Sequence, residues 1–528
     1  MLFPFFPVPP AFVLPALTEG LTEQSLSQVP TDPNPAAEPL PGFTTNPPTT
    51  PPPRLRPLRP LRPNLAPNLP PALEPEISQP QEIRPLPGRL DSVPVFNSNN
   101  PEIVSGEGIL LSTLPPEGMV NAEAHLGYAF EGRFDIFTHH ISRAATPEQV
   151  RTMFQGVVLY NPSDRPVTVQ VLNGATYLTR PDALFLPLES YLEDSRGSVF
   201  SGPGSRVVNE VLRGNRQGVL PESIVIPPRS PQLLLNLPIP VGPLTPSSNT
   251  RSLLMRLQSD GKVYAANVAL YAPRDEQGNE RAPSLEDYWT TLQTGSLVKP
   301  NDAIPTPPRS VFFVSRLIYG RVAGVAEGSV WRTTVTDPNS DKLTIAGPGR
   351  AIAYPISTLP RGTLGTEQVQ SAPMLARYPF SAYLSHGNYG VEYDLTFPLF
   401  NGSDRSQAVA VVFHTPVKTD DGGILRFLRE PPDRVFYRGT VRLQFENDRG
   451  REETRFVHIV QKRGQLGEPL IILNLKPQEM RKVRATLLYP ADATPPQVFF
   501  DLHPRPSLCR PTAAGHSRSR PPTLLITQ

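Results

Sequence analysis

The stretch GVVLYNPSDRPVTVQV, residues 156–171, is an apolar run, then a turn cluster, then a strict alternation of valine with polar residues. Alternation of this kind places one face of a strand in a core and the other in solvent. Asn161 ends the apolar run, and its short side chain can cap the backbone of the following turn. The sequence therefore predicts a strand–turn–strand hairpin with one buried face.

The same phrase is written a second time in FPLFNGSDRSQAVAVVF, residues 397–413. Asn401 takes the place of Asn161 about 240 residues later, and Ser-Asp-Arg follows in both copies. A second pair of landmarks lies in QLLLNLPIP and LIILNLKPQ, because Asn236 follows Asn161 at nearly the distance at which Asn474 follows Asn401. We interpret this order and spacing as an internal duplication.

Beyond residue 90, short β-favouring runs are separated by Pro, Gly, Asn and Asp. This texture is typical of antiparallel sandwiches and barrels. Two short helices are also predicted, TPEQVRTMF from Thr146 and SLEDYWTTLQTG from Ser284, because each begins with a capping-box pattern. The predicted fold is all-β, with two tandem β-sandwich-like units over 91–300 and 301–500 and a few short helices.

Proline accounts for 69 of the 528 residues and is concentrated before residue 80. Proline lacks a backbone N–H, so this excess belongs in linkers, loops and strand edges. The Arg-Pro-Leu repeat in PPPRLRPLRPLRP favours a solvated polyproline II segment. We expect a disordered linker over 21–90, either an inert spacer or a stalk whose arginines touch anionic polymer or lipid. The end, 501–528, is expected to be a disordered tail or the product of a shifted reading frame.

The first residues, 1–20, are apolar, contain several prolines and carry no lysine or arginine. Such a segment is too short and too interrupted to span a bilayer stably. It has the character of a secretory apolar region, so we interpret it as an atypical export signal or, alternatively, as an apolar disordered end. No later run approaches 18 uninterrupted apolar residues, so no transmembrane anchor is expected.

The composition excludes several kinds of chemistry. With Cys509 as the single cysteine, the chain has no intrachain disulfide, Cys-based zinc site or Cys-x-x-Cys pair. A net charge of +2 gives no global field that would attract nucleic acid. No nucleophile elbow, P-loop or zincin motif is present, and the GPG runs at 202–204 and 347–349 are interpreted as loop glycines. We therefore predict no catalytic residues and no cofactor.

The candidate metal ligands are Asp135, His139 and His140 in FDIFTHH, together with His386 in SHGNYG. Imidazole and carboxylate groups suit Zn²⁺ and other transition metals. In a strand, however, His139 and His140 point to opposite faces and cannot serve one ion. Hydrogen-bonded structural histidines are the favoured interpretation.

Two further sets of side chains have a functional and a structural interpretation. Paired acids are read as solvated turn and cap residues, or as glycosidase carboxylates if a cleft brings two together. Aromatic side chains could form a sugar-stacking platform or pack in the core. These aromatic residues are Trp289, Trp331, Tyr383, Tyr389 and Tyr393.

Several long strings, among them GPGSRVVNEVLRG, LIYGRVAGVAEGSVWR and RGTLGTEQVQSAPMLARYPFSAYLSHGNYGVEY, carry a family resemblance. Over about residues 81–498 the chain resembles the cyanobacterial domain of unknown function 3370 family. The resemblance implies an exported protein, periplasmic or elsewhere in the cell envelope, and it transfers no site residue.

We expect a non-enzymatic exported envelope protein with a structural or binding role, whose partner is an envelope polymer or another envelope protein. The alternative is an envelope carbohydrate-active enzyme or carbohydrate-binding protein with its site between the two units.

Overall fold

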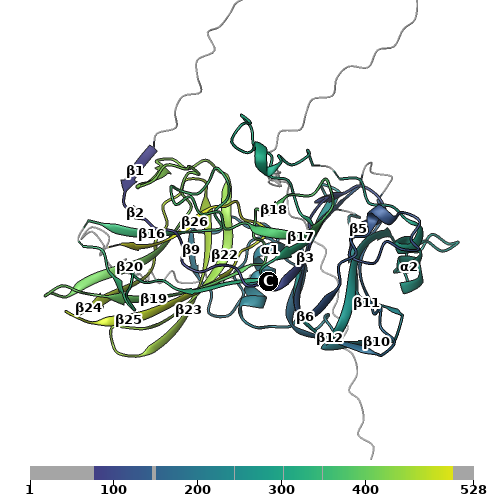
Figure 1. Ribbon diagram of the computed structural model, residues 1–528, viewed down its shortest axis with the longest axis horizontal. Helices are drawn as coiled ribbons and strands as arrows, with labels where there is room; N and C mark the ends of the chain where they lie inside the picture. Colours follow the sequence, from purple (N-terminus) through teal and green to yellow (C-terminus); the bar gives the residue numbers. More distant parts are fainter. Residues whose placement is uncertain (1–75, 145–149, 243, 301, 348, 503–528) are drawn as a thin grey trace, which may run out of the picture. The chain divides into compact units, whose positions relative to one another are not determined.

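The structure is a computed structural model and describes residues 76–144, 150–242, 244–300, 302–347 and 349–502 (Figure 1). Strands dominate these residues, and two α-helices accompany them, α1 over Pro203–Leu212 and α2 over Leu285–Thr294. The prediction of an all-β protein with a few short helices is therefore confirmed. Neither described helix has both the length and the apolar character needed to cross a bilayer.

The largest sheet has 12 strands. They are β3 (Pro94–Ser98), β4 (Ile103–Val104), β5 (Gly108–Ser112), β6 (Phe130–Arg143), β7 (Met153–Tyr160), β8 (Val167–Leu178), β10 (Ser223–Ile226), β11 (Pro231–Ile239), β12 (Ser248–Tyr271), β13 (Ala323–Glu327), β17 (Ala372–Arg377) and β18 (Leu384–Ser385). Strand β12, 24 residues long, pairs with β6 and β8 along its first half and with β5 and β7 along its second half.

The register between β12 and β6 breaks after Ser259, where β12 passes from one layer to the other. The sheet thereby doubles over and encloses a hydrophobic cluster, here called the N-terminal core, which includes Phe130, Phe134, Val157 and Met255. Alternate residues of β8 (Val167, Val169 and Val171) enter this core, as the valine alternation predicts.

A second pair of sheets encloses the C-terminal core, which includes Tyr393, Phe413, Tyr437 and Phe499. The seven-stranded sheet contains β9 (Tyr191–Glu193), β14 (Val330–Thr334), β15 (Leu343–Thr344), β19 (Glu392–Phe400), β22 (Val435–Glu446), β23 (Glu452–Lys462) and β25 (Met480–Leu488). The five-stranded sheet contains β2 (Glu82–Ile83), β16 (Ala351–Ile356), β20 (Gln407–His414), β24 (Pro469–Leu475) and β26 (Gln497–Leu502). A separate ribbon pairs β1 (Glu76–Pro80) with β21 (Ile424–Leu428).

The predicted split into units 91–300 and 301–500 is not confirmed, because strands cross that boundary in both directions. Strands β13, β17 and β18 follow residue 300 yet extend the 12-stranded sheet, where β13 pairs with β3. Strand β9 precedes it yet pairs with β23 of the C-terminal sheet. Each exchange covers a sheet edge that would otherwise expose unpaired backbone groups. The described residues form one compact unit.

The linker predicted over 21–90 ends earlier than expected. Strand β1 pairs along its whole length with β21, and Leu86 is 1% exposed in the C-terminal core. The indole of Trp331 donates to the carbonyl of Pro87 at 2.9 Å. Apolar contact and backbone pairing therefore hold the chain from Glu76 onward. The predicted export signal, the remainder of the linker and the tail beyond 502 lie outside the described residues.

The duplicated phrase has the same hydrogen bonds in both copies. Asn161 and Asn401 are each 0% exposed, and each Nδ2 donates to three backbone carbonyls. The distances are 2.7, 3.0 and 3.1 Å to Arg165, Ile226 and Pro227, and 2.8, 2.9 and 3.1 Å to Arg405, Leu475 and Lys476. The serine two residues later donates its N–H and hydroxyl to each Oδ1. Residues 156–171 and 397–413 therefore adopt matching local structures.

The phrase is not a hairpin, however. Strands β7 and β8 do not pair with each other but with opposite halves of β12. Likewise β19 lies in the seven-stranded sheet and β20 in the five-stranded one. Each copy is an arch that carries the chain from one layer of a sandwich to the other, and the buried asparagine ties it to a second connection beneath.

The predicted correspondence between Asn236 and Asn474 is wrong. Asn401 reaches the end of β24, whereas Asn161 reaches the end of β10, so β24 corresponds to β10. Pairing agrees, because Leu475 faces Gln407 where Ile226 faces Val167. Asn236 lies in β11, whose counterpart is β25, because both strands pair beside the first strand of the arch. The nearly equal spacing of these asparagines therefore does not mark corresponding positions in the two copies.

Helix α2 is confirmed in detail. Ser284 accepts from the N–H of Asp287, whose carboxylate accepts from the N–H of Ser284, and Gly295 ends the helix. Tyr288 and Leu292 are buried against the sheet. For the other predicted helix, Thr146–Gln149 lie outside the described residues, residues 150–152 are not helical, and β7 begins at Met153.

Candidate functional site

His140, one of the predicted metal ligands, is 0% exposed, and both of its ring nitrogens are engaged. Nδ1 lies 2.8 Å from the carbonyl of Pro101, which can only accept, so Nδ1 carries the proton. Nε2 therefore accepts, from Asn267 Nδ2 at 3.1 Å and the Ser98 hydroxyl at 3.0 Å. Burial lowers the pKa of His140 to about 4, so the ring is neutral near pH 7.

His139 and Asp135 belong to the same strand, β6, but have separate partners. His139 Nδ1 lies 2.6 Å from the hydroxyl of Ser252, and burial lowers the pKa of the ring. Asp135 accepts hydrogen bonds from Arg133 and from the hydroxyl of Ser329. These three side chains therefore stabilise the sheet rather than converge on one point.

His386, the fourth candidate, lies elsewhere, after β18. Its Nδ1 is 3.2 Å from the Ser371 hydroxyl, and its ring meets Tyr319 edge-on at 4.8 Å. Burial lowers the pKa of His386 to about 4, and the neighbouring charge of Lys418 acts in the same direction. Within the described residues, no group of three or more His, Cys, Asp or Glu side chains could hold a metal ion.

Treatment of the purified protein with EDTA is expected to leave its melting temperature unchanged, because the candidate imidazoles are held by hydrogen bonds. Thermal unfolding followed by circular dichroism, with elemental analysis of the untreated sample, checks this. A stoichiometric metal whose removal lowers the melting temperature would reverse the assignment of these histidines as structural.

The junction between the two sandwiches is where the alternative function places a site, and helix α1 lies in it. No helix is expected there from sequence, because Gly202 at its start offers no side-chain cap. The start is held instead by Asp492, whose Oδ2 accepts from the N–H of Ser205 at 2.9 Å. A side chain at Gly204 would lie 2.7 Å from this carboxylate, so the GPG run permits the close approach.

Apolar side chains fill the space around α1. Val207, Val208 and Val211 of the helix pack with Phe137 and Leu254 of the 12-stranded sheet and with Leu488 of β25. This cluster is here called the junction core. It packs both sandwiches against α1.

Ion pairs also link the two sandwiches, outside the apolar cluster. Arg256 of β12 lies 2.9 Å from Glu392 of β19, and both side chains are less than 15% exposed. Asp394 accepts from Arg332 and Arg484 at 2.6 Å each. Burial alone would raise the pKa of Asp394, but the two guanidinium groups outweigh it and hold the pKa below its usual value.

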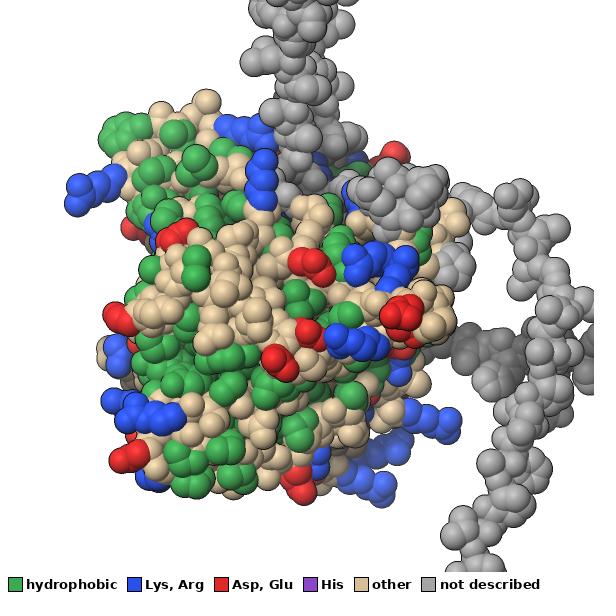
Figure 2. Space-filling view, turned by 90° about the vertical axis from the view of Figure 1, so that its right-hand side faces the viewer, with side chains coloured by type: hydrophobic (Ala, Val, Ile, Leu, Met, Phe, Trp, Pro, Cys, Tyr) green, Lys and Arg blue, Asp and Glu red, His purple; other side chains and the backbone are tan. Residues whose placement is uncertain are grey.

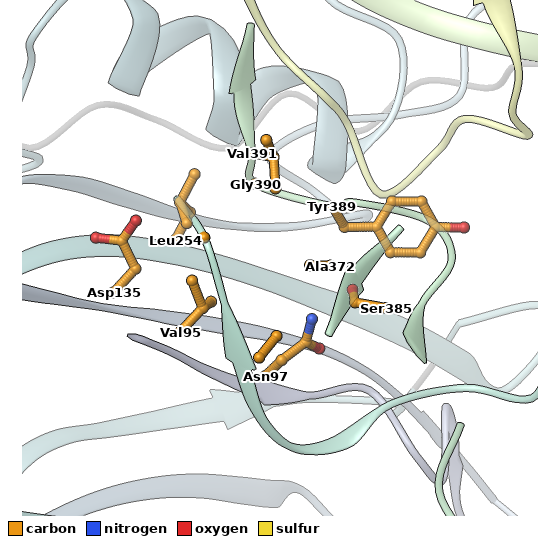
Figure 3. A pocket seen from close by; sticks show the side chains of 11 residues that line it. Val95, Asn97, Asp135, Leu254, Ala372, Ser385, Tyr389, Gly390 and Val391 are labelled. Atoms are coloured by element: carbon orange, nitrogen blue, oxygen red, sulfur yellow. The ribbon is translucent and has the colours of Figure 1, made fainter. Parts of the chain in front are cut away.

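One small cavity remains at the junction (Figure 3). Val95, Asn97, Leu254 and Ser385 line it from the 12-stranded sheet, and Tyr389 lines it from the segment before β19. Its volume is about 10 Å³, which is room for about one water molecule. The Asp135 carboxylate points away from the aliphatic side chains of this cavity (Figure 3). A sugar does not fit here.

A larger hollow of about 340 Å³ lies at the far end of the C-terminal sandwich, where the β22–β23 turn faces β24. Asp448 and Glu453 line it, each paired with an arginine, Arg481 at 2.5 Å and Arg455 at 2.7 Å. These arginines help to hold the pKa of both carboxyls below its usual value, so neither can act as a general acid near neutral pH.

The predicted aromatic platform is not assembled. Trp331 and Tyr393 stack at 6.3 Å inside the C-terminal core, as the core-packing alternative expects. Trp289 stacks instead on Tyr160, at 5.4 Å, beside α2. On the side of the molecule that carries α2, basic and acidic side chains are interspersed among hydrophobic ones (Figure 2). No histidine of the described residues is visible on this face.

Fold and junction define an all-β protein of several sheets, in which two asparagine arches have matching hydrogen bonds. The family model described as "Protein of unknown function (DUF3370)" matches residues 81–500, and the chain belongs to this family. The predicted resemblance, over nearly the same residues, is confirmed.

Two other comparisons add nothing to this. A search of curated proteins finds no match. Among solved structures, the matches include crystal structures of pumpkin seed globulin, procruciferin (an 11S globulin from Brassica napus) and the coconut allergen cocosin. They are 11%, 10% and 10% identical to this chain, with TM-scores of 0.08, 0.09 and 0.08. Each match covers 76% of this chain and 86%, 85% and 86% of the other. Scores this low carry no argument about fold or function.

Proposed function

We propose that the protein is an exported protein of the cell envelope with a structural or binding role and no catalytic activity of its own. We propose that the protein lacks catalytic activity because packed side chains fill the junction between the two sandwiches. The alternative requires a substrate site there, and ligand sites are usually clefts of several hundred Å³. The cavity found has about 10 Å³, and its charged lining side chain, Asp135, is paired with Arg133.

Export is supported by the sequence. The apolar first 20 residues and the near absence of cysteine fit a protein that leaves the cytoplasm. The arginine- and proline-rich stretch before residue 76 suits a spacer between an envelope surface and the folded part. We propose an envelope polymer or another envelope protein as the partner.

Carbohydrate hydrolysis is the second candidate, and one observation favours it, the 340 Å³ hollow with Asp448 and Glu453. Glycosidases need one carboxylic acid that is protonated near neutral pH. Both carboxyls have lowered pKa values, so this hollow suits binding of a polar ligand better than hydrolysis.

Fractionation of cells that produce the full chain is expected to recover it with periplasmic or envelope markers, because the proposal places the folded part outside the cytoplasm. Immunoblots of the fractions, with one cytoplasmic and one periplasmic marker protein, provide the measurement. Recovery with the cytoplasmic marker alone would contradict export. Release of reducing sugar from isolated cell-wall sacculi, lost in Glu453→Gln, would instead establish the enzymatic alternative.

A further inference from the structure

A loop over residues 307–317 presents two adjacent phenylalanines to solvent. Phe312 is 85% exposed and Phe313 87%, the highest values among the large hydrophobic side chains of the described residues. Single exposed apolar side chains are common on soluble proteins, but neighbouring aromatic rings left this bare mark an interaction site. The neighbouring Val311 is 9% exposed and turned inward, so it anchors the loop beneath the two exposed rings.

The loop is held in this shape from both ends and from behind. At its base, the N–H of Thr306 donates to the carbonyl of Ile318 at 2.8 Å, and the N–H of Ile318 donates to the Thr306 hydroxyl at 2.9 Å. Behind the tip, the guanidinium of Arg361 donates to the carbonyls of Val311, Val314 and Ser315. Because these bonds fix the backbone, little further ordering is needed when the two rings are buried in a partner.

The charged residues of the loop itself are both basic. Residues 303–319 contain Arg309 and Arg316 and no acidic residue. Both arginines are exposed, one on each side of the phenylalanine pair. An apolar tip between cations matches the boundary between acyl chains and anionic headgroups, where aromatic rings enter the apolar layer and arginines stay with the phosphates.

We propose that this loop docks the protein on a membrane surface that carries anionic lipids. Phe312 and Phe313 enter the outer part of the acyl layer, and Arg309 contacts lipid phosphate. A convex tip with two rings fits between lipid headgroups, which need no preformed pocket. The inference goes beyond the proposed function and does not rest on it, because it concerns one loop and can be tested with purified components.

The test is co-sedimentation of the full chain with vesicles of phosphatidylcholine alone or mixed with phosphatidylglycerol. The wild-type protein is expected to bind the mixed vesicles more tightly. The double variant Phe312→Ser, Phe313→Ser is expected to bind them at least about a hundredfold more weakly, since each buried ring contributes about a tenfold factor or more. Arg309→Gln is expected to lose about fivefold on mixed vesicles and little on phosphatidylcholine.

Val120→Ser is the matched control, because Val120 is 71% exposed and lies outside the loop. All variants should keep the wild-type melting temperature, since the replaced side chains make little contact. Equal sedimentation of the wild type and the double phenylalanine variant would overturn the proposal, and so would absence of binding to either vesicle. Dimers that the double variant abolishes, without vesicle binding, would assign the tip to contact between copies and equally overturn it.

Discussion

Acidification from about pH 7.5 to about pH 5 is expected to lower the free energy of unfolding by at least about 6 kcal/mol. Three fully buried histidines account for a change of this size, and His386, whose pKa burial also lowers to about 4, adds to it. Burial lowers the pKa of His140 to about 4, of His414 to about 3 and of His458 to about 4. In an unfolded chain an imidazole titrates near about 6.5.

The sign follows from proton linkage. Between about pH 6.5 and pH 4 these imidazoles are protonated in the unfolded state but neutral in the folded state. The free energy of unfolding therefore falls as the pH falls through this window. Above about pH 7 both states are neutral at these rings and the full stability is present. Each histidine costs about 1.4 kcal/mol per pH unit, hence about 2 kcal/mol at pH 5. The sum for three rings is comparable to the whole stability of many domains.

The neighbours of these rings explain why protonation is resisted. His140 Nε2 and His414 Nδ1 are hydrogen-bond acceptors, the second from the N–H of Gly467 at 2.7 Å. A proton on either nitrogen would remove the acceptor and place a charge in an apolar interior. His458 is 0% exposed, and its Nε2 has no hydrogen-bond partner among the described residues.

Urea unfolding at a series of pH values and constant ionic strength measures the effect. In His458→Gln, the slope of unfolding free energy against pH should decrease by one proton, about 1.4 kcal/mol per pH unit, because one of the titrating groups is gone. Equal unfolding free energies at pH 7.5 and pH 5 in the wild type would show that these imidazoles are not held neutral.

Local features of the fold could be predicted from the sequence, because their causes lie within a few residues. Helix α2 follows from Ser284, Asp287 and Gly295, which form its two caps. The arch turn follows from Asn161, whose side chain bonds its own turn. For the same reason the sequence predicts that His139 and His140, which are neighbours in one strand, point to opposite faces of the sheet.

Features with distant causes could not be predicted. Helix α1 begins without a capping side chain, and the carboxylate that holds its first turn, Asp492, is 287 residues from Ser205. A strand pattern shows which face is buried but not which sheet the strand joins, so the exchange of β9 and β13 between the sandwiches does not follow from it. The exposed pair Phe312 and Phe313 lies in VFFV, which has the composition of a buried strand.

Replacement of either arch asparagine, Asn161→Ala or Asn401→Ala, is expected to destabilise the protein by about 3 kcal/mol. Each asparagine is fully buried and serves as donor to three carbonyls and acceptor for two serine groups. Alanine leaves these backbone groups without a partner in a site closed to solvent, and each unsatisfied buried group costs about 1–3 kcal/mol. Asn401→Asp should be worse, because a carboxylate cannot donate to the carbonyls of Arg405, Leu475 and Lys476 that surround it.

Asn474→Ala is the matched control, because Asn474 is exposed and bonds only at the surface, to Asp448. It should cost less than about 1 kcal/mol, measured by urea unfolding at about pH 7.5. Since the two arches share no hydrogen-bond partner, the costs of Asn161→Ala and Asn401→Ala should be similar and should add in the double variant. A cost for Asn401→Ala no larger than the control, or a strong inequality between the two copies, would mean that the matched bonds do not carry matched energies. The two arches would then share a geometry without sharing its contribution to stability.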